Sequence, residues 1–121
     1  MTYESVTTVP SRIADGVSYT VVRLSFARRM ELMRRVRDLA KRCEFLEAGQ
    51  DSPGAMEGAL LRAEVDRVFL TWGLRAVTGL AIDGATATPE TLAESGPEEL
   101  VREALAAVRA ASGLDAAERK N

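Results

Sequence analysis

The chain has 121 residues and a formal net charge of −2; 46% of its residues are apolar and 28% are charged. These values exclude an intrinsically disordered chain and favour one folded domain with a single modest core. Its six aromatic residues leave Leu, Val, Ala and Met to build that core, which suits packed helices better than a large β-sandwich.

Residues 2–24 are expected to be extended and to form a β-hairpin. Asp15-Gly16 lies between β-branched residues, and an Asp-Gly pair in that setting is typical of a tight hairpin turn. Apolar and polar residues alternate over 17–21, so one face of that strand can be buried. Pro10 cannot donate a backbone hydrogen bond, which predicts either an edge strand or an interruption of the strand at that position.

The next element is a helix from Ser25 to Gly49, with Ser25 as N-cap and Gly49 as its end. It carries both the clearest helical period and the densest positive charge of the chain. The apolar residues that recur at three- and four-residue steps, and are expected to face the core, are Phe26, Met30, Met33, Val36, Leu39, Ala40, Cys43 and Leu46. Seven arginines and lysines occupy much of the remainder.

Ser52-Pro53 begins a second helix, which is expected to run to about Trp72 and to fold back on the first as an antiparallel hairpin. Its expected buried side consists of Met56, Leu60, Leu61, Val65, Val68, Phe69 and Trp72. Helical periodicity is lost over 74–88, where a second Asp-Gly pair predicts one or two short strands. These strands could pair with the amino-terminal hairpin.

Thr88-Pro89 and Gly96-Pro97 begin two further helices, the second with a buried stripe that runs from Leu100 to Val108. The sequence therefore predicts a mainly α, α+β fold in one domain. It comprises a β-hairpin over 2–24, a helical core over 25–112, with a short extended segment near 77–87, and a flexible tail over 113–121.

Charge is divided along the chain. Residues 25–47 contain seven basic and four acidic residues, whereas residues 83–121 contain four basic and eight acidic ones. Such polarity serves an intramolecular match or an assembly contact. The arginine-rich helix also admits nucleic-acid binding, but acidic residues are interspersed on it and no aromatic platform accompanies it, so a solvated or protein-binding face is favoured.

No pattern of catalytic residues is present. The chain has no histidine, which removes the commonest general base and metal ligand, and it has neither a P-loop nor a G-x-G-x-x-G motif. We predict no catalytic, metal or cofactor-binding residues, and hence no enzyme. A single cysteine, Cys43, and the lack of a signal-like start or a long apolar run favour a cytoplasmic protein.

The order of motifs over residues 24–121 resembles the small tail assembly chaperones of long-tailed bacteriophages and prophages. The shared features are a Trp that closes a helix, a glycine-containing extended run, two helix starts and a terminal Lys-Asn. Here they correspond to Trp72, residues 79–84, Thr88 to Leu92, Gly96 to Leu100, and Lys120-Asn121. The amino-terminal hairpin is less characteristic of that family.

The resemblance implies a non-enzymatic factor that binds the tape measure protein, recruits tail tube subunits, acts in the cytoplasm of the bacterial host and is absent from the mature virion. It also implies possible self-association. Expected partner-binding residues are Arg28, Arg29, Met30, Met33, Arg34, Arg37, Met56, Lys120 and Asn121. The alternatives are a structural tail-completion or connector protein and a small nucleic-acid-binding regulator that uses the arginine-rich helix.

Overall fold

The computed structural model describes residues 1–49 and 52–112, and over these ranges the chain is mainly helical with small antiparallel sheets, as predicted. The elements are β1 (Val6–Pro10), β2 (Ser18–Val22), α1 (Phe26–Gly49), α2 (Ser52–Gly73), β3 (Leu74–Thr78), β4 (Ala81–Ile82), β5 (Ala85–Thr86), α3 (Pro89–Ser95) and α4 (Glu98–Ser112). The predicted tail over 113–121 lies outside the described residues.

The main sheet has three antiparallel strands in the order β1-β2-β3. Tyr19 of the central strand lies opposite Val9 on one side and Val77 on the other. The amino-terminal hairpin therefore pairs with the start of the predicted extended segment only. The rest of that segment forms a separate hairpin, β4-β5, whose turn residues Asp83 and Gly84 have φ of 51° and 82°, so the second Asp-Gly prediction is confirmed.

The predicted tight turn at Asp15-Gly16 is present, since the Val17 N–H donates to the Ala14 carbonyl oxygen at 3.3 Å and Gly16 has a φ of 80°, but the turn does not join the two strands directly. β1 ends at Pro10 and β2 begins at Ser18, so a longer loop joins them. Within this loop the Ser11 hydroxyl accepts hydrogen bonds from the backbone N–H groups of Ile13 and Ala14, at 3.1 and 3.0 Å. These local bonds stabilise the part of the loop that precedes the Asp15-Gly16 turn.

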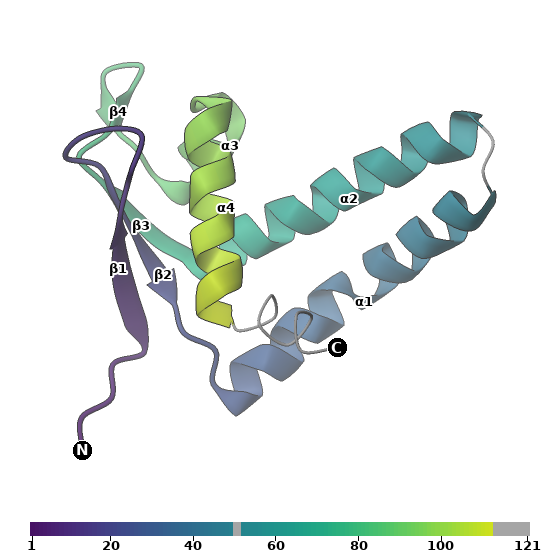
Figure 1. Ribbon diagram of the computed structural model, residues 1–121, viewed down its shortest axis with the longest axis horizontal. Coiled ribbons are helices and arrows are strands. Elements are labelled where there is room, and N and C mark those ends of the chain that lie inside the picture. The colour runs from purple at the N-terminus through teal and green to yellow at the C-terminus, as the bar shows by residue number, and fades with distance from the viewer. Residues whose placement is uncertain (50–51, 113–121) are drawn as a thin grey trace.

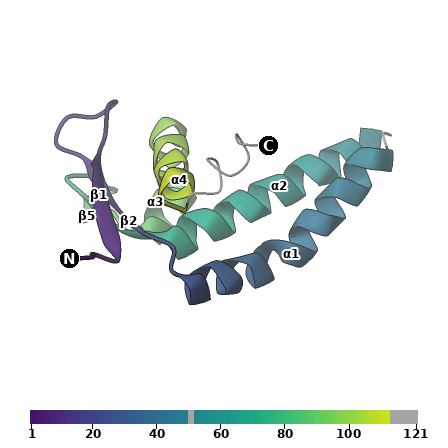
Figure 2. The same ribbon diagram turned by 60° about the horizontal axis from the view of Figure 1, so that its bottom comes forward.

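The molecule consists of a compact body and a long helical hairpin that projects from it (Figure 1). In the body, α4 packs on β2 and on the end of α2 that leads into β3. α1 and α2 run antiparallel and pack against each other; they lie closest at the end where they are joined and separate toward the body (Figures 1 and 2). Ser25 caps α1, because its hydroxyl accepts a hydrogen bond from the Arg28 N–H at 3.3 Å.

The core lies where the sheet, α3, α4 and the body end of α2 meet. Its fully enclosed side chains include Tyr19 and Val21 of β2, Leu92 of α3, and Ala104 of α4. The alternation predicted for β2 is confirmed, since Val17, Tyr19 and Val21 are buried. Of the α1 side chains whose burial the structure describes, Leu32 alone belongs to this cluster of buried residues.

The predicted buried side of α1 is wrong over its first two turns. Phe26, Met30 and Met33 are exposed, whereas Leu32 is only 1% exposed and the partly buried Val36 follows it. At about 100° per residue, the three exposed side chains lie roughly 100–160° around the helix from Leu32. α1 therefore has two apolar sides, and packing against α2 buries the side that includes Leu32.

In α2 the prediction is wrong at Met56 and Leu60, which are also exposed, while Leu61 and Phe69 are buried. The reason is the same, because Met56 and Leu60 lie roughly 100–140° around α2 from Leu61. Both helices of the hairpin thus bury one apolar side against each other and leave another uncovered.

Candidate protein-binding surface

The most prominent uncovered apolar surface is a row of three side chains on α1, Phe26, Met30 and Met33, which we call the α1 stripe. Their exposed fractions are 83%, 44% and 56%. Positions i, i+4 and i+7 lie on one side of a helix, so the three side chains form a continuous strip one residue wide. This spacing is the one by which an amphipathic helix is recognised, or by which it recognises a partner.

The arginines predicted to bind a partner divide into two groups. Arg28 stacks over the Trp72 ring, with its guanidinium carbon 5.2 Å from the ring centroid, and Arg29 donates to the Ser112 carbonyl oxygen at 3.5 Å. Both side chains therefore contact the rest of the fold. Arg34 and Arg37 are exposed and lie roughly 40° or less around the helix from Met30, so they flank the α1 stripe.

The structure does not bring Met56 together with Met30 and Met33. Because α1 and α2 are antiparallel and joined through residues 50–51, Met56 lies near the level of residue 45. That level is about 18 Å along the hairpin from Met33 at 1.5 Å per residue. The remaining two predicted binding residues, Lys120 and Asn121, lie outside the described residues.

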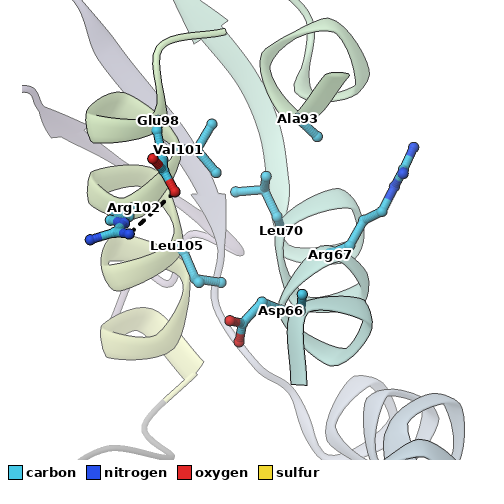
Figure 3. Close-up of a pocket in the computed structure, with 9 residues that line it drawn as sticks. Asp66, Arg67, Leu70, Ala93, Glu98, Val101, Arg102 and Leu105 are labelled. Carbon is cyan, nitrogen blue, oxygen red and sulfur yellow. Dashed lines mark hydrogen bonds and ion pairs between the residues drawn. The ribbon is translucent and has the colours of Figure 1, made fainter. Parts of the chain in front are cut away.

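A second apolar surface is a cleft of about 380 Å³ between α2, α3 and α4, which we call the α2 cleft (Figure 3). Leu70 and Ala63 of α2, Ala93 of α3, and Val101 and Leu105 of α4 supply its apolar lining. The exposed Leu60, 62% exposed, and Met56, 77% exposed, extend the same side of α2 away from the body.

Ion pairs border the α2 cleft. Arg67 pairs with Glu94 at 2.7 Å and Arg102 with Glu98 at 3.2 Å. Asp66, which lines the cleft, bonds to the Arg109 guanidinium at 2.5 Å, and that guanidinium lies 4.5 Å from the Phe69 ring centroid. The cleft thus has an apolar floor and a charged rim. The sequence did not predict it, because its lining comes from three helices that are far apart in the chain.

A partly buried polar cluster around Glu103 holds the loop between β1 and β2 on α4. The Glu103 carboxylate accepts hydrogen bonds from the Ser11 hydroxyl at 2.5 Å, the Arg12 N–H at 2.8 Å and the Tyr19 hydroxyl at 2.7 Å. Burial and then the bond to Glu103 raise the pKa of Tyr19 to about 12. Burial acts to raise the pKa of Glu103, but these donated hydrogen bonds outweigh it and lower that pKa below its usual value.

Both pKa values are shifted away from neutrality, so neither group changes protonation near pH 7 as a general acid or base would.

Among the described residues there is no group of three or more acidic or cysteine side chains that could hold a metal ion. No helix within the described ranges is long and apolar enough to cross a membrane. Comparisons with family models, with curated proteins and with solved structures find no match.

Proposed function

We propose that this protein is a non-enzymatic tail assembly chaperone of a long-tailed phage or prophage, which binds the tape measure protein and recruits tail tube subunits in the host cytoplasm. The observation that carries the proposal is the α1 stripe, an exposed apolar row on the most basic helix of the chain. The order of helix starts and ends over 24–121, which resembles that family, supports it.

The α1 stripe has the properties that a carrier of long amphipathic helices needs. Flexible thioether side chains such as Met30 and Met33 adapt to many apolar partners, so they hide a client's apolar face without requiring one sequence. Phe26 adds a large aromatic surface at the end of the row. A helical client would lie along α1 with its own apolar residues against these three side chains.

The charge around the α1 stripe defines the client further. Residues 26–42 contain seven basic and two acidic residues, so a client helix with acidic residues beside its apolar stripe is preferred. Arg34 and Arg37 can pair with such carboxylates without giving up a contact to the body. Arg28 cannot, because its guanidinium stacks on the Trp72 ring. Charge pairs at the exposed rim of an interface increase the association rate and orient the client helix on α1 more than they increase its affinity.

The test is co-expression with the tape measure protein of the same gene cluster, followed by pull-down and size-exclusion chromatography. We expect the client to become soluble and to co-elute with the wild-type chain. Met33→Glu should abolish co-elution while leaving the fold intact, because Met33 is exposed and the new carboxylate lies one helical turn from both Arg29 and Arg37.

Ile13→Glu is the matched control, because Ile13 is 55% exposed but lies in the loop between β1 and β2. It should bind the client as well as the wild type does. Unchanged client binding by Met33→Glu would contradict the proposal for the α1 stripe. An insoluble client, together with this chain in purified virions, would instead establish the alternative of a structural tail component.

A further inference from the structure

α2 has a second apolar side, about opposite the one that is buried in the hairpin. Four of its apolar side chains lie roughly 100–180° around the helix from the buried Leu61, and we call them the α2 row: Met56, Leu60, Ala63 and Leu70. Successive members are four, three and seven residues apart, which is the spacing of the a and d positions of a heptad repeat. The row is about 20 Å, or about four helical turns, long. This spacing is the one at which one helix packs along another.

The body encloses the α2 row at one end only. There Leu70 is 2% exposed, and Val101 and Leu105 of α4 point toward it across the α2 cleft (Figure 3). Beyond the cleft the row is open, since Leu60 and Met56 are both exposed. The row therefore starts inside the cleft and continues along an uncovered side of the hairpin.

The charged groups at the α2 cleft are paired with one another and so favour no charge on a ligand. The ion pairs are Arg109–Asp66, Arg67–Glu94 and Arg102–Glu98. Arg67 occupies the remaining heptad position, between Ala63 and Leu70, but its side chain points away from the cleft (Figure 3). The part of a ligand that enters the cleft is therefore apolar and uncharged.

The open part of the α2 row has acidic residues on one flank. Glu57 and Glu64 each follow a member of the row, Met56 or Ala63, by one residue, which is the e position of the same repeat. Both are exposed, and neither pairs with a cation among the residues that the structure describes. Charged residues at such positions select the partner of a helix, so two basic residues seven apart are complementary to this flank.

We propose that the α2 row and the α2 cleft together bind one amphipathic helix of a different protein. This helix is at least about four turns long, has apolar residues at three- and four-residue steps, and carries basic residues beside them that meet Glu57 and Glu64. Its end inserts large apolar side chains into the cleft, whose volume of about 380 Å³ lies in the range of small-ligand pockets, about 300–1,000 Å³. A small ligand would fill the cleft but leave Leu60 and Met56 uncovered.

The α1 helix of a second copy does not fit this description. The α1 stripe has three members over about 10 Å, about half the length of the row, and Arg37 occupies the next step after Met33 in the same spacing. α1 would therefore leave half of the row uncovered or place a guanidinium against it. Because the row shares no residue with the α1 stripe, the proposal does not depend on what binds to the stripe.

The probe is a synthetic helical peptide of about three heptads with leucine at a and d, lysine at the flanking positions, and alanine or glutamine elsewhere. A second peptide has glutamate in place of each lysine. Fluorescence anisotropy measures the Kd of each labelled peptide for the full-length protein, at peptide concentrations where sedimentation shows the peptide to be monomeric. The wild type should bind the lysine peptide about two- to tenfold more tightly at low salt, because that peptide gains two exposed ion pairs. This preference should decrease at high salt.

Three variants test the flank and the row separately. The double substitution Glu57→Lys/Glu64→Lys reverses the charge of the flank and should make the glutamate peptide the tighter ligand. Ala63→Arg places bulk and charge in the middle of the row, where Ala63 is exposed and lines the cleft, and should weaken binding of both peptides at least about tenfold. Leu60→Gln, an exposed change outside the cleft, should weaken both as well. All of these substitutions place good helix formers at exposed sites, so the fold is preserved.

Met33→Glu and Ile13→Glu are the controls and should bind both peptides like the wild type, since neither residue belongs to the α2 row. The proposal is overturned if the lysine peptide does not bind at the highest soluble concentration of the protein, if the exchange of charges leaves the preference unchanged, or if Ala63→Arg and Leu60→Gln both bind like the wild type. Loss of binding in Met33→Glu would overturn it by placing the peptide on the α1 stripe. Self-association of the wild type that Ala63→Arg abolishes would overturn it by making a second copy the occupant.

Discussion

The body of this protein encloses its large apolar side chains, whereas the helical hairpin leaves several of its own exposed. In the body, Tyr19, Leu92 and Ala104 are fully enclosed, and the loop between β1 and β2 is held on α4 by three hydrogen bonds to one carboxylate. In the described part of the hairpin, Phe26 and Met56 are largely exposed although their helices pack against each other.

The difference shows which part of the molecule is available for a partner. A side chain enclosed by its own chain contributes to stability, and its loss leaves a cavity. An exposed apolar side chain on a helix contributes little to folding and is free to bind. We therefore expect substitutions in the body to change stability and matched substitutions in the hairpin to change binding alone.

The largest expected effect is that of Leu92→Ala in α3. Leu92 is 0% exposed, so its truncation should lower the free energy of unfolding by about 3 kcal/mol. Leu60→Ala removes the same atoms from an exposed position of α2 and should change it by less than about 0.5 kcal/mol. Urea denaturation of both variants measures the difference, and equal losses would break the comparison.

Gly79 and Gly84, two glycines of the body, have similar backbone conformations but different surroundings. Gly79 and Gly84 both have positive φ, 81° and 82°. A Cβ at Gly79 would overlap the carbonyl oxygen of Gly16, whereas a Cβ at Gly84 meets nothing within 4 Å. Gly84→Ala should cost only the backbone term of about 1 kcal/mol, and Gly79→Ala should lower the thermal midpoint distinctly further, because the loop between β1 and β2 must move.

The Glu103 cluster makes the stability of the body depend on pH. Because the folded state lowers the pKa of Glu103, its stabilising contribution is present above the usual carboxyl pKa and is lost as pH falls through the folded value. Glu103→Gln should therefore lower the free energy of unfolding by about 1–3 kcal/mol at pH 7. That free energy should also fall less steeply in the variant than in the wild type as the pH is lowered. Urea midpoints between neutral and acidic pH test this.

Glu57→Gln, at an exposed position of the hairpin, is the matched control for that series. Its urea midpoint should equal that of the wild type at each pH. At the alkaline end, the Tyr19 pKa of about 12 predicts a loss of stability as pH rises above the ordinary tyrosine value of 10.0. Tyr19→Phe should remove this alkaline loss, which the same denaturation series would detect.

The smallest expected effect concerns the junction between hairpin and body. Arg28→Ala removes the guanidinium from the Trp72 ring and should cost about 0.5–1 kcal/mol, with a change in fluorescence that belongs to the single tryptophan. Arg34→Ala, an exposed change on the same helix, should leave both quantities unchanged. A fluorescence change in Arg34→Ala alone would reverse our division of the arginines.

The sequence by itself determined where most elements begin and end. Thr88 shows the physical reason, because its hydroxyl accepts from the Thr91 N–H at 3.1 Å and its own N–H donates to the Thr91 hydroxyl at 2.8 Å. A cap of this kind, like the Asp83-Gly84 turn, satisfies backbone groups within a few residues. Such signals are local, so they can be recognised without knowledge of the rest of the fold.

Only the tertiary structure decided which apolar side of α1 is buried. The row that starts at Phe26 and the side that includes Leu32 both fit a helical period, and α2 covers the second. The loop over 11–17 and the α2 cleft have the same origin, since Glu103 lies about 90 residues from Ser11 and the cleft joins three helices. Contacts between distant segments set these features, and no local pattern encodes them.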